Sequence, residues 1–239
     1  SRGSQIYSNI RRNRQNFIPG ETQRWSSRAY DYLRANHPFQ PISPWRIHNN
    51  SIRIRNNFNN YYFFTGPWYR RYPRAWYPSV WVYGSPWVYA PWPMLSVWMG
   101  YPTASPVYYN YGGNVIYQDN SVYVNGQNVG TAAQYYQQAQ NLAEGGADED
   151  PDKNAQWMSL GVFALSQGDQ TSSNMVLQLA VNKEGVIRGN YVNSAANEQK
   201  VVEGGVDKQT QRAAWIIGDN KNVVFDTGLY NLTKDETTV

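Results

Sequence analysis

The side chains that most often perform catalysis are scarce in this chain of 239 residues. It contains two histidines, His37 and His48, and no cysteine. The missing thiols exclude cysteine nucleophiles, disulfides and thiolate metal sites, and two imidazoles fall short of the three or four ligands of a zinc site. Both histidines lie in an arginine-rich stretch without a nucleophile motif. We therefore expect no enzymatic activity, no cofactor and no bound metal.

Acidic side chains form one dense run: Asp148, Glu149, Asp150 and Asp152. Calcium accepts several carboxylate oxygens, but this run lacks the alternating ligands and the central glycine of an EF-hand loop. Two interpretations stand beside calcium, namely a solvated linker and a loop that docks an arginine-rich segment. We keep these four residues as a candidate acidic docking loop.

Charge divides the chain at about residue 111. Residues 1–111 hold 13 arginines, no lysine and two acids, a formal charge of +11, whereas residues 112–239 hold two arginines, six lysines and 15 acids, a formal charge of −7. Eight of the ten tryptophans and 14 of the 20 tyrosines lie in the basic part. Arginine stacks on the faces of aromatic rings, and its planar fork suits buried pairing better than the ammonium group of lysine does. We expect the two parts to attract each other, within one chain or between copies.

The arginines and tryptophans of the basic part are the candidate interaction residues. They are Arg70, Arg71, Arg74, Trp68, Trp76, Trp81, Trp87, Trp92 and Trp98. Arginine among aromatic rings also suits single-stranded nucleic acid, but no RNA-binding sheet motif or recognition helix accompanies these residues. Exposed tryptophan and tyrosine also stack on sugars, so polysaccharide is an alternative partner and nucleic acid is the less favoured one.

The elements that must position these side chains differ along the chain. Residues 1–65 read as a basic polar arm, with a helix predicted over 21–36 and an alternating strand over 51–60. Residues 66–111 contain eight prolines among closely spaced aromatics, which excludes a long helix and predicts an extended segment.

The second part of the chain carries clearer local signals. Residues 112–146 predict a β-hairpin with its turn at Asp119-Asn120, then a helix that is capped by Thr131 and stopped by Gly145-Gly146. Residues 147–155 are an acidic linker. Residues 156–239 alternate with a period of two in six short runs, which predicts a small antiparallel barrel or sandwich with Trp157 and Trp215 in its core.

The run SPVYYNYGGNVIYQDNSVYVNGQNVGTAAQYYQQAQNLA, followed by WMSLGVFALSQGD and GGVDKQTQRAAW, resembles a group of planctomycete envelope or secreted proteins. These proteins are labelled mu-protocadherin or protocadherin-like. The resemblance covers roughly residues 66–230. It implies a Trp/Tyr/Pro-rich stretch, a hairpin, a short helix and a β-domain, with no catalytic residues and no calcium-binding cadherin repeats.

Together these patterns predict a mainly β protein with an extended Arg/aromatic-rich N-terminal arm, a β-hairpin plus short helix, and a small antiparallel β-barrel or sandwich. We expect a non-enzymatic structural protein of the bacterial cell surface or extracellular space, which assembles with itself or with other subunits through its arm. A carbohydrate-binding module is the alternative. No apolar run is long enough for a membrane span. We expect the gene product to extend beyond this chain.

Overall fold

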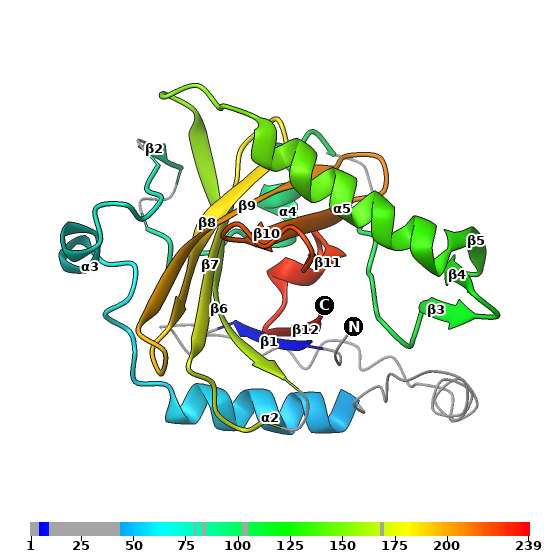
Figure 1. The fold of residues 1–239 in the computed structure, drawn as a ribbon, viewed down its shortest axis with the longest axis horizontal. Coiled ribbons are helices and arrows are strands. Elements are labelled where there is room, and N and C mark those ends of the chain that lie inside the picture. The colour runs from blue at the N-terminus through cyan, green and yellow to red at the C-terminus, as the bar shows by residue number, and fades with distance from the viewer. Residues whose placement is uncertain (1–4, 10–43, 79, 83–84, 102–104, 168–169) are drawn as a thin grey trace.

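A curled antiparallel β-sheet dominates the computed structural model (Figure 1). The structure describes residues 5–9, 44–78, 80–82, 85–101, 105–167 and 170–239. The helix predicted over 21–36 and His37 lie outside these residues. Within them the protein is mainly β, as the sequence predicted.

The sheet is a meander with two strands added beside its first member. The meander consists of β6 (Gln156–Gln167), β7 (Met175–Val181), β8 (Val186–Asn193), β9 (Glu198–Asp207), β10 (Arg212–Ile217) and β11 (Phe225–Gly228). On the other side of β6 lie β1 (Gln5–Asn9) and then β12 (Glu236–Thr238). The six predicted strands are therefore confirmed. Alternate apolar residues of these strands, such as Phe163, Leu177 and Trp215, form the core on the concave side of the half-barrel.

The two ends of the sheet meet through side chains. Thr227 of β11 donates a hydrogen bond from Oγ1 to the carbonyl of Thr238 in β12 at 3.1 Å. The 3-10 turn η1 (Asn231–Thr233) lies between these strands, and Asn231 donates to Thr237 Oγ1 at 2.9 Å. Hydrogen bonds from side chains therefore link the two edge strands, β11 and β12, which do not pair with each other as strands.

A short helix from the arm fills the concave face. Helix α4 (Trp92–Trp98) places Leu95 at 0% exposure against the core that contains Phe163 and Trp215. The backbone N–H of Ala90 donates to the carbonyl of Ser159 in β6 at 3.1 Å. The core of the β-domain is therefore completed by a segment more than fifty residues earlier in the chain. Trp157 and Trp215 are 4% and 0% exposed, which confirms their predicted burial.

The convex face of β6 to β8 is covered by helix α2 (Pro44–Asn57) and helix α3 (Gly66–Arg71). The strand predicted over residues 51–60 is wrong, because this stretch belongs mostly to α2. Buried side chains recur there at helical spacing: Ile47, Ser51, Ile54 and Phe58. That period extends over three turns and outweighs the four-residue alternation around Ile52, which is 37% exposed.

The segment 66–111 is not wholly extended. Helices α3 and α4 have six and seven residues, and each carries a proline in its first turn, where the missing N–H costs nothing. Between them, β2 (Val80–Trp81) pairs in parallel with the start of β6. None of the described helices is long and apolar enough to cross a bilayer.

A three-stranded unit precedes the long helix. It consists of β3 (Val115–Gln118), β4 (Ser121–Val124) and β5 (Gln127–Thr131). Asp119 and Asn120 both have positive φ, at 47° and 62°, which confirms the predicted hairpin turn. Helix α5 (Ala132–Asp148) then starts with a reciprocal capping box, in which the backbone N–H groups of Gln134 and Thr131 donate to each other's side chains.

Helix α5 runs through Gly145-Gly146, which the sequence predicted as its stop. A Cβ atom built on Gly146 would lie 1.9 Å from the carbonyl oxygen of Gly204 in β9. The second glycine therefore serves the close approach of helix to sheet. Small side chains such as Ala143 continue the same buried face.

A buried arginine joins α5 to the sheet. Arg212 of β10 lies with its guanidinium carbon 3.6 Å from the ring centroid of Tyr135 and its Nε 2.7 Å from Asp226 Oδ2. The hydroxyl of Tyr111 also donates to Asp226. Burial, reinforced by the charge of Asp226, raises the pKa of the neighbouring Tyr117 to about 12.

Candidate functional site

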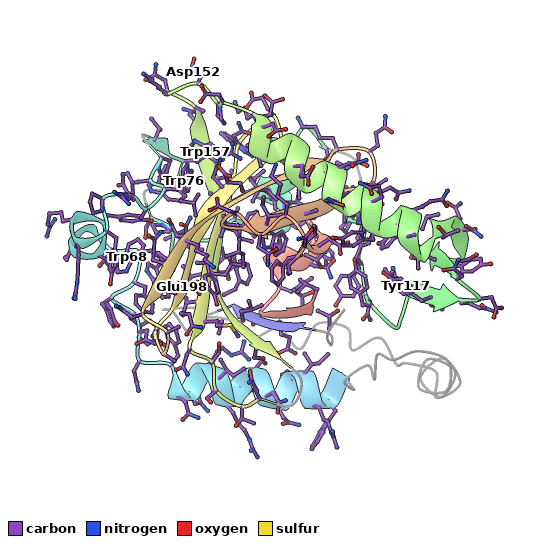
Figure 2. The ribbon with its side chains drawn as sticks, viewed as in Figure 1. Trp68, Trp76, Tyr117, Asp152, Trp157 and Glu198 are labelled. Atoms are coloured by element: carbon purple, nitrogen blue, oxygen red, sulfur yellow. The ribbon has the colours of Figure 1, made fainter. Side chains whose placement is uncertain are left out.

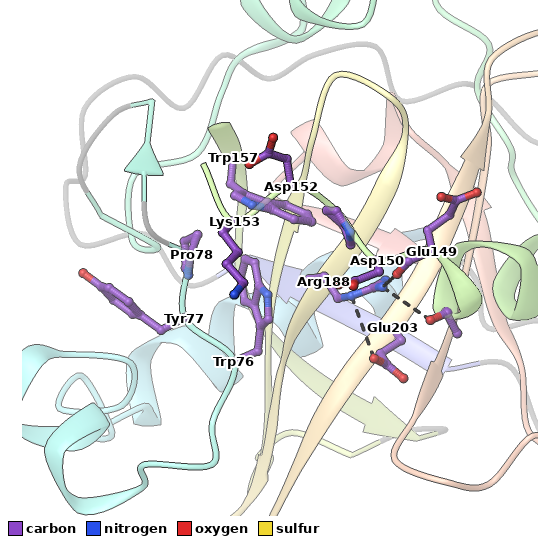
Figure 3. Close-up of a pocket in the computed structure, with 12 residues that line it drawn as sticks. Trp76, Tyr77, Pro78, Glu149, Asp150, Asp152, Lys153, Trp157, Arg188 and Glu203 are labelled. Atoms are coloured by element: carbon purple, nitrogen blue, oxygen red, sulfur yellow. Dashed lines mark hydrogen bonds and ion pairs between the residues drawn. The ribbon is translucent and has the colours of Figure 1, made fainter. Parts of the chain in front are cut away.

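A pocket of about 320 Å³ opens where the arm meets the end of α5 (Figure 3). One wall comes from the arm and the other from the loop after α5. Its floor is formed by residues of β6, β8 and β9. The lining side chains that matter here are Trp76, Tyr77, Glu149, Asp150, Asp152, Lys153, Trp157, Arg188 and Glu203.

The arm wall is held by a buried amide. Asn190 of β8 accepts a hydrogen bond from the backbone N–H of Trp76 at 2.9 Å and donates to the carbonyl of the same residue at 2.8 Å. The Trp76 ring packs edge-on against Trp157 at 4.9 Å between centroids (Figure 2). Tyr77 is 58% exposed, and its ring is directed away from the acidic loop (Figure 3) and packs edge-on against Tyr69 with 4.6 Å between ring centroids. The aromatic wall is thus fixed in position before any ligand arrives.

The acidic wall is held by an arginine of the sheet. Arg188 is 6% exposed and donates from Nη1 to the carbonyl of Gly146 at 2.8 Å and from Nη2 to that of Glu149 at 2.6 Å. These contacts satisfy carbonyls that the end of α5 leaves without helical partners. Its Nε lies 3.8 Å from Glu203. Burial lowers the pKa of Arg188, and the nearby carboxylates oppose that effect.

The carboxylates of this wall point to solvent. Glu149, Asp150 and Asp152 are exposed, and the only hydrogen bond shown for their side chains within the described chain joins Asp152 to the backbone N–H of Asn154. Arg188 binds the loop mainly through backbone carbonyls, so the loop's carboxylates stay exposed to solvent at the edge of the pocket. Aromatic rings opposite exposed carboxylates suit a cation with a flat or apolar face, or a sugar.

The structure brings few of the predicted interaction residues to this pocket. Of the tryptophans, Trp76 lines it, together with three of the four acidic-loop residues. Trp68 is 4% exposed and packs on Phe64, 4.9 Å between ring centroids. The remaining predicted tryptophans are partly buried against the same chain: Trp81, Trp87, Trp92 and Trp98.

The predicted arginines lie elsewhere on the surface. Arg70, Arg71 and Arg74 are exposed, on α3 and just after it. In the described part of the chain no ion pair is formed by any of the three. These three arginine side chains are accessible to an external partner, whereas most of the tryptophan side chains around them are wholly or partly buried.

Sequence reasoning missed Arg188, Asn190 and Glu203. A signal existed for the first, because residues 112–239 contain two arginines against six lysines. Both arginines, Arg188 and Arg212, are buried and donate to backbone carbonyls of α5. In this domain, an arginine at a buried strand position therefore marks a contact between the sheet and the backbone of α5.

His48 has a packing role. Its Nδ1 lies 2.8 Å from Glu236 Oε1, and Ser51 donates to the other oxygen of the same carboxylate. These contacts tie α2 to β12. Among the residues that the structure describes, no three His, Asp or Glu side chains gather as a metal site.

Comparison with known proteins gives no family for this chain. No family model, curated protein or solved structure matches it. The resemblance to the protocadherin-like planctomycete proteins therefore stays a hypothesis.

Proposed function

We propose that this chain is a non-enzymatic structural protein of the bacterial cell surface or extracellular space, whose copies assemble by pairing arm arginines with the acidic loop. The observation that carries the proposal is the exposure of both charged groups. Arg70, Arg71 and Arg74 have no carboxylate partner in the described chain, and neither Glu149 nor Asp150 has a cation within ion-pair distance there. The location rests on the sequence resemblance.

The folded arm changes what drives assembly. Its large rings are packed against the sheet of the same chain, as the burial of Trp68 shows, so few remain to be buried between copies. Charge pairing then supplies a larger share of the contact. Exposed charges are screened beyond about 8 Å at physiological ionic strength, and we expect assembly to weaken steeply as salt is added.

Sedimentation velocity across a salt series tests the proposal. The test variant carries Asp148→Asn, Glu149→Gln, Asp150→Asn and Asp152→Asn. Its control changes four exposed or half-exposed acids elsewhere and has the same net charge: Asp119→Asn, Glu184→Gln, Glu198→Gln and Asp219→Asn. We expect the test variant to stay monomeric at low salt while the control assembles. A parent chain that is monomeric under every condition contradicts the proposal.

A carbohydrate-binding role is the second candidate, and the Trp76 ring, which lines the pocket together with the acidic loop, favours it. Sugars stack on such rings while carboxylates accept their hydroxyl hydrogens. Binding of the chain to insoluble polysaccharide, lost in Trp76→Ala and kept in the control variant, would support this candidate. Equal binding by both variants would oppose it.

A further inference from the structure

We propose that a second pocket, at the end of α2, binds one sugar ring of a neutral saccharide. This site shares no lining residue with the pocket beside Trp76. The proposal depends neither on the acidic loop nor on assembly between copies. It commits to an uncharged ligand that is rich in hydroxyl groups.

Three segments that are distant in sequence enclose a pocket of about 280 Å³. The first is the end of α2 with the residues that follow it. The others are residues 172–174, which lead into β7, and Ser194, which follows β8; the meander places both at the same end of the sheet, beside the end of α2 (Figure 1). The lining consists of four asparagines, three serines, one isoleucine and one phenylalanine.

Hydrogen bonds to the sheet hold the walls of this pocket. The hydroxyl of Ser173 donates to the carbonyl of Leu165 in β6 and accepts from the backbone N–H of Met175 at 3.0 Å. The backbone N–H of Ser194 donates to the carbonyl of Asn174 at 2.9 Å, which joins the two turns. Walls that are already held in place lose little conformational freedom when a ligand binds.

The base of the pocket is apolar and is fixed by packing. Ile54 and Phe58 line it, although they are only 2% and 5% exposed. The Phe58 ring packs edge-on against Tyr61 with 5.0 Å between ring centroids, and the centroid of Trp87 lies 6.3 Å from it. An apolar base with polar groups around it is the usual design of a small-molecule site. Here the base suits the carbon-bound hydrogens on one face of a sugar ring.

The rim offers amide groups that the protein does not use. Within the described chain no hydrogen bond is formed by the side chains of Asn57, Asn59, Asn60 and Asn174. Each amide donates through its nitrogen and accepts through its oxygen, and a sugar hydroxyl both donates and accepts. Hydroxyls can therefore replace the waters that hydrate these amides without leaving a donor or acceptor unpaired.

The charge and the size of the pocket narrow the ligand class. No charged side chain of the described chain lines it, and Arg55 of α2 instead lies 4.0 Å from Asp235 and 3.9 Å from Glu236. A charged ligand would lose its hydration without gaining a counter-ion. A volume of 280 Å³ falls just below the about 300–1,000 Å³ range of pockets for drug-sized ligands. It suits one ring, such as the end of a neutral saccharide.

Isothermal titration calorimetry with short saccharides tests the ligand class. The probes are maltotriose, cellotriose, mannotriose and triacetylchitotriose, and trigalacturonic acid is the charged control. We expect at least one neutral probe to bind and the acid to bind at least tenfold more weakly, because the pocket offers it no counter-ion. Failure of all four neutral probes to bind with a Kd below about 10 mM, or equal binding of the acid, would overturn the proposal.

Paired variants test the site. Asn59→Ala with Asn174→Ala removes amides from two segments of the rim, and we expect about tenfold weaker binding from the loss of two neutral hydrogen bonds. Ser172→Trp places a large ring at the rim and should abolish binding. The matched control, Asn56→Ala with Asn154→Ala, removes two exposed amides that do not line the pocket and should bind like the parent.

The outcomes separate this site from the pocket beside Trp76. Trp76→Ala should bind the neutral probe like the parent. Binding that survives in Ser172→Trp and is lost in Trp76→Ala would overturn the inference and favour a sugar at the Trp76 ring. Assembly is measured separately by sedimentation, so failure of the sugar site leaves the proposed structural function standing.

Discussion

The seat of α5 on β9 makes a sharp prediction about two adjacent glycines. In Gly146→Ala the new Cβ would lie 1.9 Å from the carbonyl oxygen of Gly204 and 2.5 Å from the backbone nitrogen of Gly205. Ordinary contacts begin at 3.4 Å, so helix and strand must separate by more than 1 Å. Gly145→Ala, one position earlier, meets nothing within 4 Å.

The two substitutions should shift the free energy of unfolding in opposite directions. Overpacking costs about 1–3 kcal/mol, and the upper part of that range applies to Gly146→Ala because the atoms met are backbone. Alanine recovers about 1 kcal/mol of helix propensity, which leaves a net loss of roughly 2 kcal/mol. Gly145→Ala has only the propensity effect and should gain about 0.5–1 kcal/mol.

Equilibrium urea unfolding, followed by tryptophan fluorescence, measures both variants against the parent. The buried Trp215 in the core makes this signal sensitive to the folded sheet. The reasoning is refuted if Gly146→Ala is as stable as the parent, or if both variants move in the same direction.

Three further predictions concern the α5 unit. Asp226→Asn leaves the 5%-exposed Arg212 without its carboxylate, so urea unfolding should show a loss of about 3 kcal/mol; a loss below 1 kcal/mol would contradict this. Thr131→Ala removes one half of the capping box with Gln134 and should cost about 1 kcal/mol in the same assay, whereas no change would mean that the cap is not needed. Tyr117 has a pKa of about 12 in the folded protein against 10.0 in a free tyrosine, so its contribution to stability is complete below pH 10 and is lost as the pH rises to 12, because the unfolded chain releases this proton first. Tyr117→Phe should therefore reduce the fall in the free energy of unfolding between pH 10 and 12, and an unchanged slope would argue against this.

Elements with a local cause were predictable from sequence. The Asp119-Asn120 turn, the Thr131 cap and the alternation of the meander each depend on neighbours within a few residues, and the structure confirms all three. Burial of Trp157 and Trp215 followed from that alternation.

Elements with a tertiary cause were not predictable in this way. Ile52 and Ile54 alternate like a strand, and α2 forms because a sheet covers one helical face. Gly146 looks like a helix stop until Gly204 is placed opposite it. The pocket depends on Arg188, whose partners are carbonyls some forty residues away, a relation that no local pattern expresses.

The plug formed by α4 has a consequence for synthesis. Gln156, the first residue of β6, follows Trp98 by 58 positions, so at about 5–20 residues per second on the order of 3–12 s pass before synthesis of the sheet that will cover the plug even begins. During that interval Leu95 and its aromatic neighbours have no folded partner in the meander. Prolines 86, 91 and 93 flank or interrupt this stretch, and they deny it the backbone donors needed for pairing with other nascent chains. We therefore expect the proline-rich composition to lower the tendency of the growing chain to aggregate before the sheet is complete.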